Sequence, residues 1–279
     1  MIAESEIRRF AARWQVDPMV VDLDYGLGWF LIAFHSAGQV TQSLRFKGGT
    51  CLRKCYFPDY RFSEDLDFTA EAYLAPQHLL EAIQRATRWS IDHDGPDFVA
   101  LPPRLEVVED EYGRESYQVR IYYRGPLRWS GTPRAIRVDV TRDEQLLLPA
   151  ESRRVLHPYS DSATLPEVAL ACYPLEEILA EKIRALGGQR RFAISRDLYD
   201  IHQLVQAGVI IERVKPLLPA KFAARGIDLS SAYVDRLVQR RNEFEQDWRH
   251  KLAYLIASTV SFEAAWTTSI NVLRQSLPV

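Results

Sequence analysis

The sequence is poor in cysteine and contains no long apolar run. Only three of its 279 residues are cysteine (Cys51, Cys55 and Cys172), and so small and odd a number favours a reduced protein over a disulfide scaffold. Cys51 and Cys55 lie at helical spacing, but as metal ligands they would need thiolate or histidine partners at a suitable spacing, and none is apparent. No stretch is long enough to span a membrane, and the N-terminal MIAESEIRRF lacks a signal-peptide pattern. We therefore expect a cytoplasmic protein with no membrane partner.

The sequence also lacks a large net charge. Its formal charge of −2 gives no whole-molecule signal for nucleic acid or membrane, so any such surface must be local. The segment 182–225 holds nine Lys or Arg residues against three acidic ones, which suits a phosphate-rich partner. A solvated helical face explains this segment equally well. The nine are Lys182, Arg184, Arg190, Arg191, Arg196, Arg213, Lys215, Lys221 and Arg225.

Hydrophobic periodicity predicts an α+β protein. Alternating or apolar runs predict strands over 44–47, 66–69, 105–108, 117–123 and 135–141, and helical spacing predicts helices over 1–16, from 18 to about 38, over 50–56 and from 76. Strands of this kind suggest a mixed sheet with helices on one side. From 174 onward only helices are predicted, over 175–186, 196–207, 214–224, 231–247 and 261–277. We expect an N-terminal domain over 1–160, with a mixed β-sheet flanked by helices, and an all-helical C-terminal domain over 161–279.

Two aspartates on one predicted strand are the first candidates for chemistry. Asp65 and Asp67 stand at i and i+2, so their carboxylates point the same way, an arrangement that is costly unless a cation lies between them. Divalent cations bridging a triphosphate would satisfy them. Asp139, on another alternating strand, is a natural third carboxylate that could share a metal or take a proton from an attacking hydroxyl. Alone, it is equally a solvated strand residue beside Arg137.

A glycine turn precedes the two aspartates. Gly48, Gly49 and Thr50 follow a strand and open a helix, so their backbone N–H groups could bind phosphate, with the Thr50 hydroxyl as a further donor. This is not a Walker loop, because the G-x-x-x-x-G-K-[ST] pattern is missing. Lys47 precedes the glycines and could point to either face of the strand. Ser63 could line the same pocket or simply serve a turn.

The predicted helical region contains further charged candidates. Lys182 stands at the edge of the apolar face of its helix, and on spacing alone it is an ordinary helix lysine. Asp197 and Asp200 lie at i, i+3 at the start of the next helix, where Asp197 could simply favour the helix dipole.

These motifs together resemble a known family. KGGT, RFSEDLDF, a later RVDV strand, YPLEEILAEKIRAL and RDLYDI resemble the AbiEii-like nucleotidyltransferases, which are toxins of AbiE/Men-type toxin–antitoxin systems within the polymerase-β-like superfamily. The match touches residues 44 to about 202. It implies an N-terminal nucleotidyltransferase domain, a helical C-terminal domain, one or two Mg²⁺ ions and an NTP donor. It further implies nucleotide addition to the tRNA 3′ acceptor end, which blocks aminoacylation, and a separate antitoxin.

The resemblance also implies roles for individual residues. Ser63 and Asp65 match the family's serine and leading aspartate, and Asp67 matches the second aspartate. Lys182 matches a helix lysine that would contact the triphosphate. Asp197 matches the aspartate of the R-D-x-x-D segment, with Asp200 as its second. Asp139 or Asp197 would take the proton of the attacking hydroxyl.

One position departs from the superfamily pattern. Gly49 stands where the turn usually has serine, so Thr50 or Ser63 would have to supply any hydroxyl contact to the phosphates. Two other functions remain open on the sequence. The acceptor could be a small molecule or a protein hydroxyl, or the chain could be a non-catalytic nucleotide-binding module.

Overall fold

The computed structural model describes residues 1–109, 115–128, 130–142, 144–188, 192–256 and 260–278. It divides into two compact units, one formed by Met1–Glu144 and Ala150–Cys172, the other by Gln145–Pro149 and Tyr173–Val279. The expected boundary at residue 160 lies inside the first unit. The α+β class is confirmed, with a mixed sheet in the first unit and helices α5–α11 in the second.

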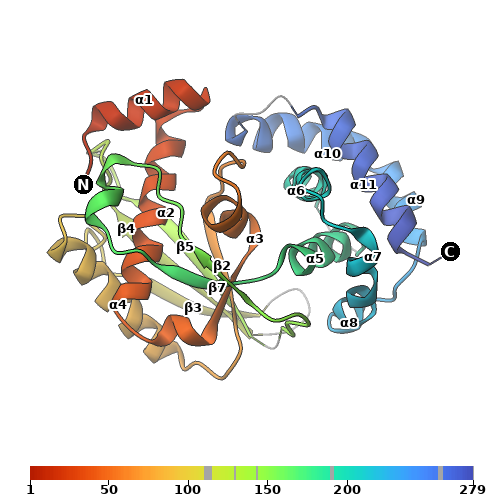
Figure 1. Ribbon diagram of the computed structural model, residues 1–279, viewed down its shortest axis with the longest axis horizontal. Helices are drawn as coiled ribbons and strands as arrows, with labels where there is room; N and C mark the ends of the chain where they lie inside the picture. Colours follow the sequence, from red (N-terminus) through yellow and green to blue (C-terminus); the bar gives the residue numbers. More distant parts are fainter. Residues whose placement is uncertain (110–114, 129, 143, 189–191, 257–259, 279) are drawn as a thin grey trace. The chain divides into compact units, whose positions relative to one another are not determined.

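The first unit is built on a mixed sheet (Figure 1). The sheet has seven strands in the order β3-β4-β5-β2-β1-β7-β6. The pairs β1–β7 and β2–β5 are parallel, and the other neighbouring pairs are antiparallel. The strands are β1 (Leu44–Lys47), β2 (Asp65–Ala70), β3 (Arg104–Glu109), β4 (Glu115–Tyr123), β5 (Arg134–Thr141), β6 (Glu151–Arg154) and β7 (Ala169–Cys172). The last two were not predicted from the sequence.

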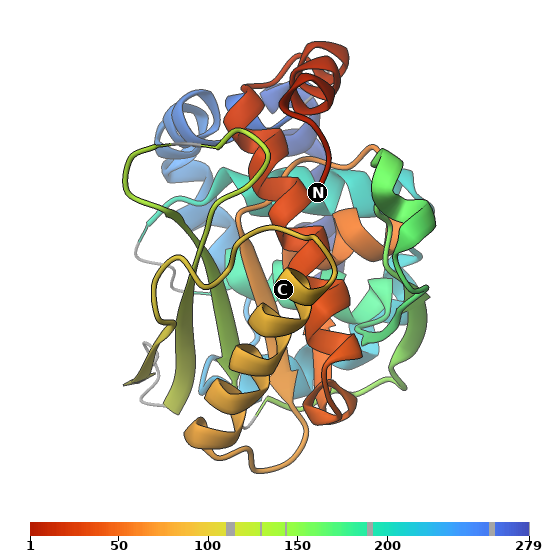
Figure 2. The same ribbon diagram turned by 90° about the vertical axis from the view of Figure 1, so that its left-hand side faces the viewer.

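One face of this sheet is apolar and covered by helices. Phe46, Phe68, Val140 and Tyr117 lie side by side across β1, β2, β5 and β4, and all four are buried. The long helices α2 (Pro18–Ser36) and α4 (Pro76–Asp92) lie over this face (Figure 2). The ring of Phe34 from α2 lies 6.2 Å from that of Phe68. Because paired residues share a face, the neighbouring row of the sheet must point to the opposite side.

Helix α2 is the central helix of the first unit. Asp17 caps its first turn by accepting a hydrogen bond from the backbone N–H of Met19 at 2.7 Å, and Pro18 occupies the first position. The helix continues through Gly26 and Gly28 without interruption. A Cβ at Gly26 would lie 3.0 Å from the ring of Tyr123, so this glycine permits close packing of α2 on β4.

A fully buried charge cluster fixes α2 to the segment after β1. The Asp24 carboxylate accepts hydrogen bonds from Arg53 and Lys54 at 2.6 Å each and from the Tyr159 hydroxyl at 2.8 Å. Burial opposes ionisation of Asp24, but the two cations keep its pKa below the ordinary value. The helical segment that supplies Arg53 and Lys54 comprises α3 (Gly48–Cys51) and η2 (Leu52–Tyr56). Short helix α1 (Glu4–Trp14) packs on α2.

The second unit is helical. Its elements are α5 (Leu175–Gly187), α6 (Ser195–Gln206), α7 (Ile211–Val214), η4 (Lys215–Leu217), α8 (Leu218–Ala223), α9 (Ala232–Gln239), α10 (Arg241–Asp247), η5 (Trp248–Leu252), η6 (Ala253–Leu255) and α11 (Phe262–Ser276). The single helix expected over 231–247 is wrong, because the chain leaves helical geometry at Arg240 and starts α10 anew. Helices α5, α6 and α11 pack around a core that includes Leu198 and Leu273.

A buried ion pair holds the segment Gln145–Pro149 in the second unit. Glu177 of α5 accepts hydrogen bonds from the backbone N–H groups of Leu147 and Leu148 at 3.0 and 3.1 Å. The ammonium of Lys221 lies 2.6 Å from the same carboxylate.

Among the described residues, no helix is both long and apolar enough to cross a membrane.

Candidate active site

The polar face of the sheet carries the three predicted carboxylates. Asp67 of β2 is paired directly with Asp139 of β5, and Asp65 lies two residues before Asp67 on the same strand. The buried Leu66 between them points to the apolar face. The sheet register therefore brings together the three aspartates that the sequence singled out, and it does so through the parallel pairing of β2 with β5.

Asp139 is electrostatically the least satisfied of the three. Its Oδ1 atom is buried and has no hydrogen-bond partner among the described residues. Burial first, then the charges of Asp67 and Asp65, raise its pKa from 3.8 to about 7, although Arg137 acts in the opposite direction. Arg137 lies 3.5 Å from Asp65 but is 55% exposed, so it compensates only weakly. Three oxygen-donor carboxylates with one buried unsatisfied oxygen fit a hard divalent cation such as Mg²⁺.

The polar row continues onto β1. Lys47 is paired with Asp67, so its side chain points to the carboxylate face. The Lys47 ammonium contacts the buried carboxylate of Glu144, which also accepts a hydrogen bond from Thr141 at 3.2 Å. The sequence left the direction of Lys47 open and did not single out Glu144.

Gly48 approaches the carboxylates through its backbone. Its φ is +76°, and a Cβ built there would collide with the Asp67 carboxylate. Only glycine fits both requirements. The turn after β1 is thereby held directly against the carboxylate row.

Gly49 makes room for an arginine. A Cβ at this position would collide with the guanidinium of Arg61, which is buried and donates a hydrogen bond to the carbonyl of Phe62 at 3.1 Å. The place that a serine side chain would take is therefore occupied by a positive charge. Sequence reasoning missed Arg61, although it stands two residues before Ser63 in the RFSEDLDF motif.

The two hydroxyl candidates differ in their surroundings. Thr50 is buried and its hydroxyl donates a hydrogen bond to the backbone carbonyl of Asp65. This bond links the first turn of α3 to the start of β2 and so helps to position the aspartate. Ser63 is also buried, two residues before Asp65.

The second unit holds the remaining predicted residues together. The Lys182 ammonium lies 2.8 Å from a carboxylate oxygen of Asp197 and 2.8 Å from one of Asp200. Both aspartates are buried, at 2% and 0% exposure, whereas the Lys182 side chain keeps 16% of its surface accessible. The two acids therefore fix the ammonium between α5 and α6.

The predicted basic surface changes in the structure. Lys221 is 3% exposed and lies against Glu177 and Glu181, so it adds no charge to any surface. Including Lys221 in a basic surface was wrong, because counting charged residues along the sequence does not show which of them are buried. Arg190 and Arg191 lie outside the described residues.

Several solved structures share this fold, among them a nucleotidyltransferase toxin and a putative nucleotidyltransferase. The nucleotidyltransferase toxin MenT4 from Mycobacterium tuberculosis H37Rv aligns with a TM-score of 0.62 at 20% identity, over 100% of each chain. JHP933 from Helicobacter pylori aligns with a TM-score of 0.55 at 13% identity, over 93% of this chain and 94% of that one. A putative nucleotidyltransferase from H. pylori gives 0.54 and 16%, covering 91% of this chain and 95% of that one. No curated protein matches the chain.

The family follows from the sequence match. The model of the family described as nucleotidyl transferase AbiEii toxin, type IV TA system, matches residues 29–268, and the chain belongs to that family. It is therefore a nucleotidyltransferase toxin by family, with a nucleoside triphosphate as the implied substrate and an antitoxin as the implied partner. The resemblance drawn from the motifs is confirmed.

Proposed function

We propose that this chain is a Mg²⁺-dependent enzyme that transfers a nucleoside monophosphate from an NTP to RNA, with the tRNA 3′ acceptor end as the acceptor. The observation that carries the proposal is the direct pairing of Asp67 with Asp139 beside Asp65, with one buried carboxylate oxygen left unsatisfied. In the reaction, the 3′-hydroxyl oxygen forms a bond to the α-phosphorus while the bond to the leaving pyrophosphate breaks. Modification of the acceptor end would block aminoacylation and hence translation.

Asp65, Asp67 and Asp139 would hold the metal. Bound there, Mg²⁺ would supply charge neutralisation at the phosphates. The protein's own contribution is a fixed row of carboxylates, aligned by the β2–β5 register before any substrate binds. Burial and the neighbouring aspartates raise the pKa of Asp139 to about 7. This carboxylate is therefore suited to share the metal or to accept the hydroxyl proton.

The phosphates would be bound by the turn after β1 and by the guanidinium of Arg61. Gly48 and Gly49 present backbone N–H groups at the start of a helical segment, and Arg61 lies against Gly49. Arg61 therefore takes over the donor role of the superfamily's serine, with a charge that suits phosphate. Thr50 helps to position Asp65 through the hydrogen bond from its hydroxyl to the Asp65 carbonyl. Ser63 lies buried two residues before Asp65. Lys47 lies on the same face of the sheet, with its ammonium held against Glu144.

Lys182 keeps the triphosphate-binding role that the family resemblance implies for it. Its accessible ammonium is oriented by Asp197 and Asp200, which makes these two acids positioning residues. Asp139 is a better proton acceptor than Asp197, because Asp197 already shares the charge of Lys182.

Labelling of RNA tests the function. Purified protein with Mg²⁺, total tRNA and each of the four α-labelled NTPs should give labelled RNA with at least one nucleotide. Asp65→Ala should abolish the label, whereas Asp59→Ala, which removes an exposed acid on the preceding loop, should keep it. Full activity of the Asp65 variant would refute the site, and no label with any nucleotide would refute RNA as the acceptor.

The same reaction distinguishes the acceptors. Label that enters the protein itself or a small molecule, and not RNA, would move the assignment to the alternative acceptors. Sequencing of tRNA 3′ ends from cells expressing the protein should show added nucleotides. Coexpression of a cognate antitoxin should prevent this addition.

A further inference from the structure

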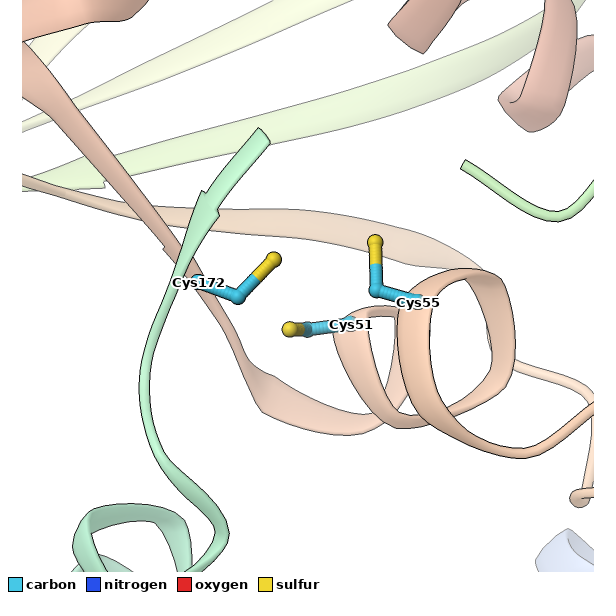
Figure 3. Close-up of side chains that lie close together, drawn as sticks. All are labelled: Cys51, Cys55 and Cys172. Atoms are coloured by element: carbon cyan, nitrogen blue, oxygen red, sulfur yellow. The ribbon is translucent and has the colours of Figure 1, made fainter. Parts of the chain in front are cut away.

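All three cysteines of the chain converge in the first unit. Cys51 is the last residue of α3, Cys55 lies in η2 and Cys172 ends β7, and their sulfur atoms lie within 4.8 Å of one another (Figure 3). Cys51 and Cys172 are completely buried and Cys55 is 7% exposed. The sequence showed no partner at a suitable spacing for Cys51 and Cys55, but the fold brings Cys172 to them from a distant part of the chain.

The fold explains why the three meet. β7 pairs in parallel with β1 at Phe46 and Cys172, and α3 leaves β1 directly. Cys51 therefore lies above the end of β7. Cys55, four residues further along the helical segment, lies on the same side as Cys51.

The spacing of the sulfurs suits a metal ion. With metal–sulfur bonds of about 2.3 Å, three thiolates stand about 3.8 Å apart in a tetrahedral site and about 4.0 Å apart in a trigonal one. The observed limit of 4.8 Å requires only a small contraction. A Cys51–Cys55 disulfide fits less well, because Cβ atoms four residues apart on a helix are about 5–6 Å apart and a disulfide needs about 4 Å.

Cationic side chains stand beside the cluster. Lys54 directly precedes Cys55 in the chain, and Arg153 lies on β6, the strand paired with β7. Arg153 stacks over the ring of Tyr56 at 4.5 Å and donates a hydrogen bond to Glu151 at 2.8 Å. These cations would offset the negative charge of a metal–thiolate centre.

We propose that Cys51, Cys55 and Cys172 bind one thiophilic metal ion, of the class of Zn²⁺ or Cu⁺. Both ions accept thiolate ligands; Cu⁺ is satisfied by three sulfurs, and Zn²⁺ would take a water molecule as its fourth ligand. The bound ion would join the helical segment after the glycine turn to β7. This site differs from the carboxylate site in position and in donor chemistry.

Spectroscopic titration of the whole, reduced protein tests the site. Co²⁺ serves as the probe, because a thiolate-to-cobalt charge-transfer band can come only from these three cysteines, the only ones in the chain. We expect the band to saturate at one equivalent and to disappear on addition of Zn²⁺. Native mass spectrometry with Zn²⁺ and with Cu⁺ should show one more bound ion in the wild type than in Cys172→Ala, and the preferred ion should raise Tm.

Two variants give the test its control. Cys172→Ala should lose the band and the Tm increase, whereas Leu170→Ala, which disturbs the same strand but removes no thiol, should keep both. Cu⁺ uptake without a cobalt band would support the site and assign it to Cu⁺. The proposal is overturned if the reduced wild-type protein gives no thiolate-to-cobalt band and takes up no more Zn²⁺ or Cu⁺ than Cys172→Ala does. It is also overturned if the untreated protein is lighter by two hydrogens, as in a disulfide, and shows neither signal after reduction.

Discussion

Asp139→Asn should stabilise the metal-free protein while it abolishes activity. In the folded chain the pKa of Asp139 is about 7 against an ordinary 3.8, so the ionised carboxylate costs stability. At roughly 1.4 kcal/mol for each tenfold change in proton affinity, the upper bound is about 4 kcal/mol. Screening of this partly accessible group reduces it to about 2 kcal/mol. Asparagine keeps the size of the side chain and removes the repulsion from Asp67 and Asp65.

The pH dependence follows from the sign of the shift. Because the folded protein binds this proton more tightly than the unfolded one, the cost is absent below the unfolded pKa of 3.8, grows as pH rises, and is complete above about 7. The advantage of the variant should therefore be largest near pH 8 and should vanish towards about pH 4. Mg²⁺ should stabilise the wild type more than the variant, because it relieves the same repulsion.

Urea denaturation in EDTA at the two pH values measures this. Asp59→Asn, on an exposed loop, is the control and should change the free energy of unfolding by less than about 0.5 kcal/mol. The reasoning is refuted if Asp139→Asn is no more stable than the wild type near pH 8. It is equally refuted if its advantage persists unchanged at the acidic pH.

Four further variants, at three positions, test other features. Asp24→Ala leaves Arg53 and its neighbouring lysine buried without their counter-charge and should cost about 3–5 kcal/mol in urea denaturation; a cost under 1 kcal/mol would contradict this. Gly49→Ser, which restores the superfamily residue, should displace Arg61 and lower kcat/KM roughly tenfold in tRNA labelling, and an equally active serine variant would argue against Arg61 as the phosphate donor. Lys182→Met removes the cation shared by two buried aspartates and should destabilise the protein by about 3 kcal/mol at neutral pH. Lys182→Arg should recover part of that loss in thermal unfolding, and a methionine variant with unchanged Tm would exclude the structural role.

The pattern of apolar residues along the sequence predicted those helices and strands in which this pattern is strongly periodic. The alternation around Asp139 and the helical spacing of 76–92 are both present in the structure. β6 and β7 were missed because each has four residues, and the sequence of β7, ALAC, contains no β-branched residue. Short strands of this kind form because a neighbouring strand pairs with them, which a local pattern cannot reveal.

The candidate site shows the same limit. Asp65, Asp67 and Asp139 could be found because carboxylates at strand spacing are unusual without a cation. Arg61 could not, since only the fold of the loop before β2 brings its guanidinium against Gly49. The cysteine cluster depends on a strand pairing between residues more than a hundred positions apart.

The late position of β7 in the sequence has a consequence for how the protein is made. β1 emerges early from the ribosome, but one of its edges stays unpaired until Cys172 has been synthesised, because β7 is the strand that pairs there. The glycine turn therefore acquires its full support only after about three-fifths of the chain exists. A fragment ending at residue 160 would expose that edge to other chains and should aggregate, whereas one ending after Cys172 completes the sheet.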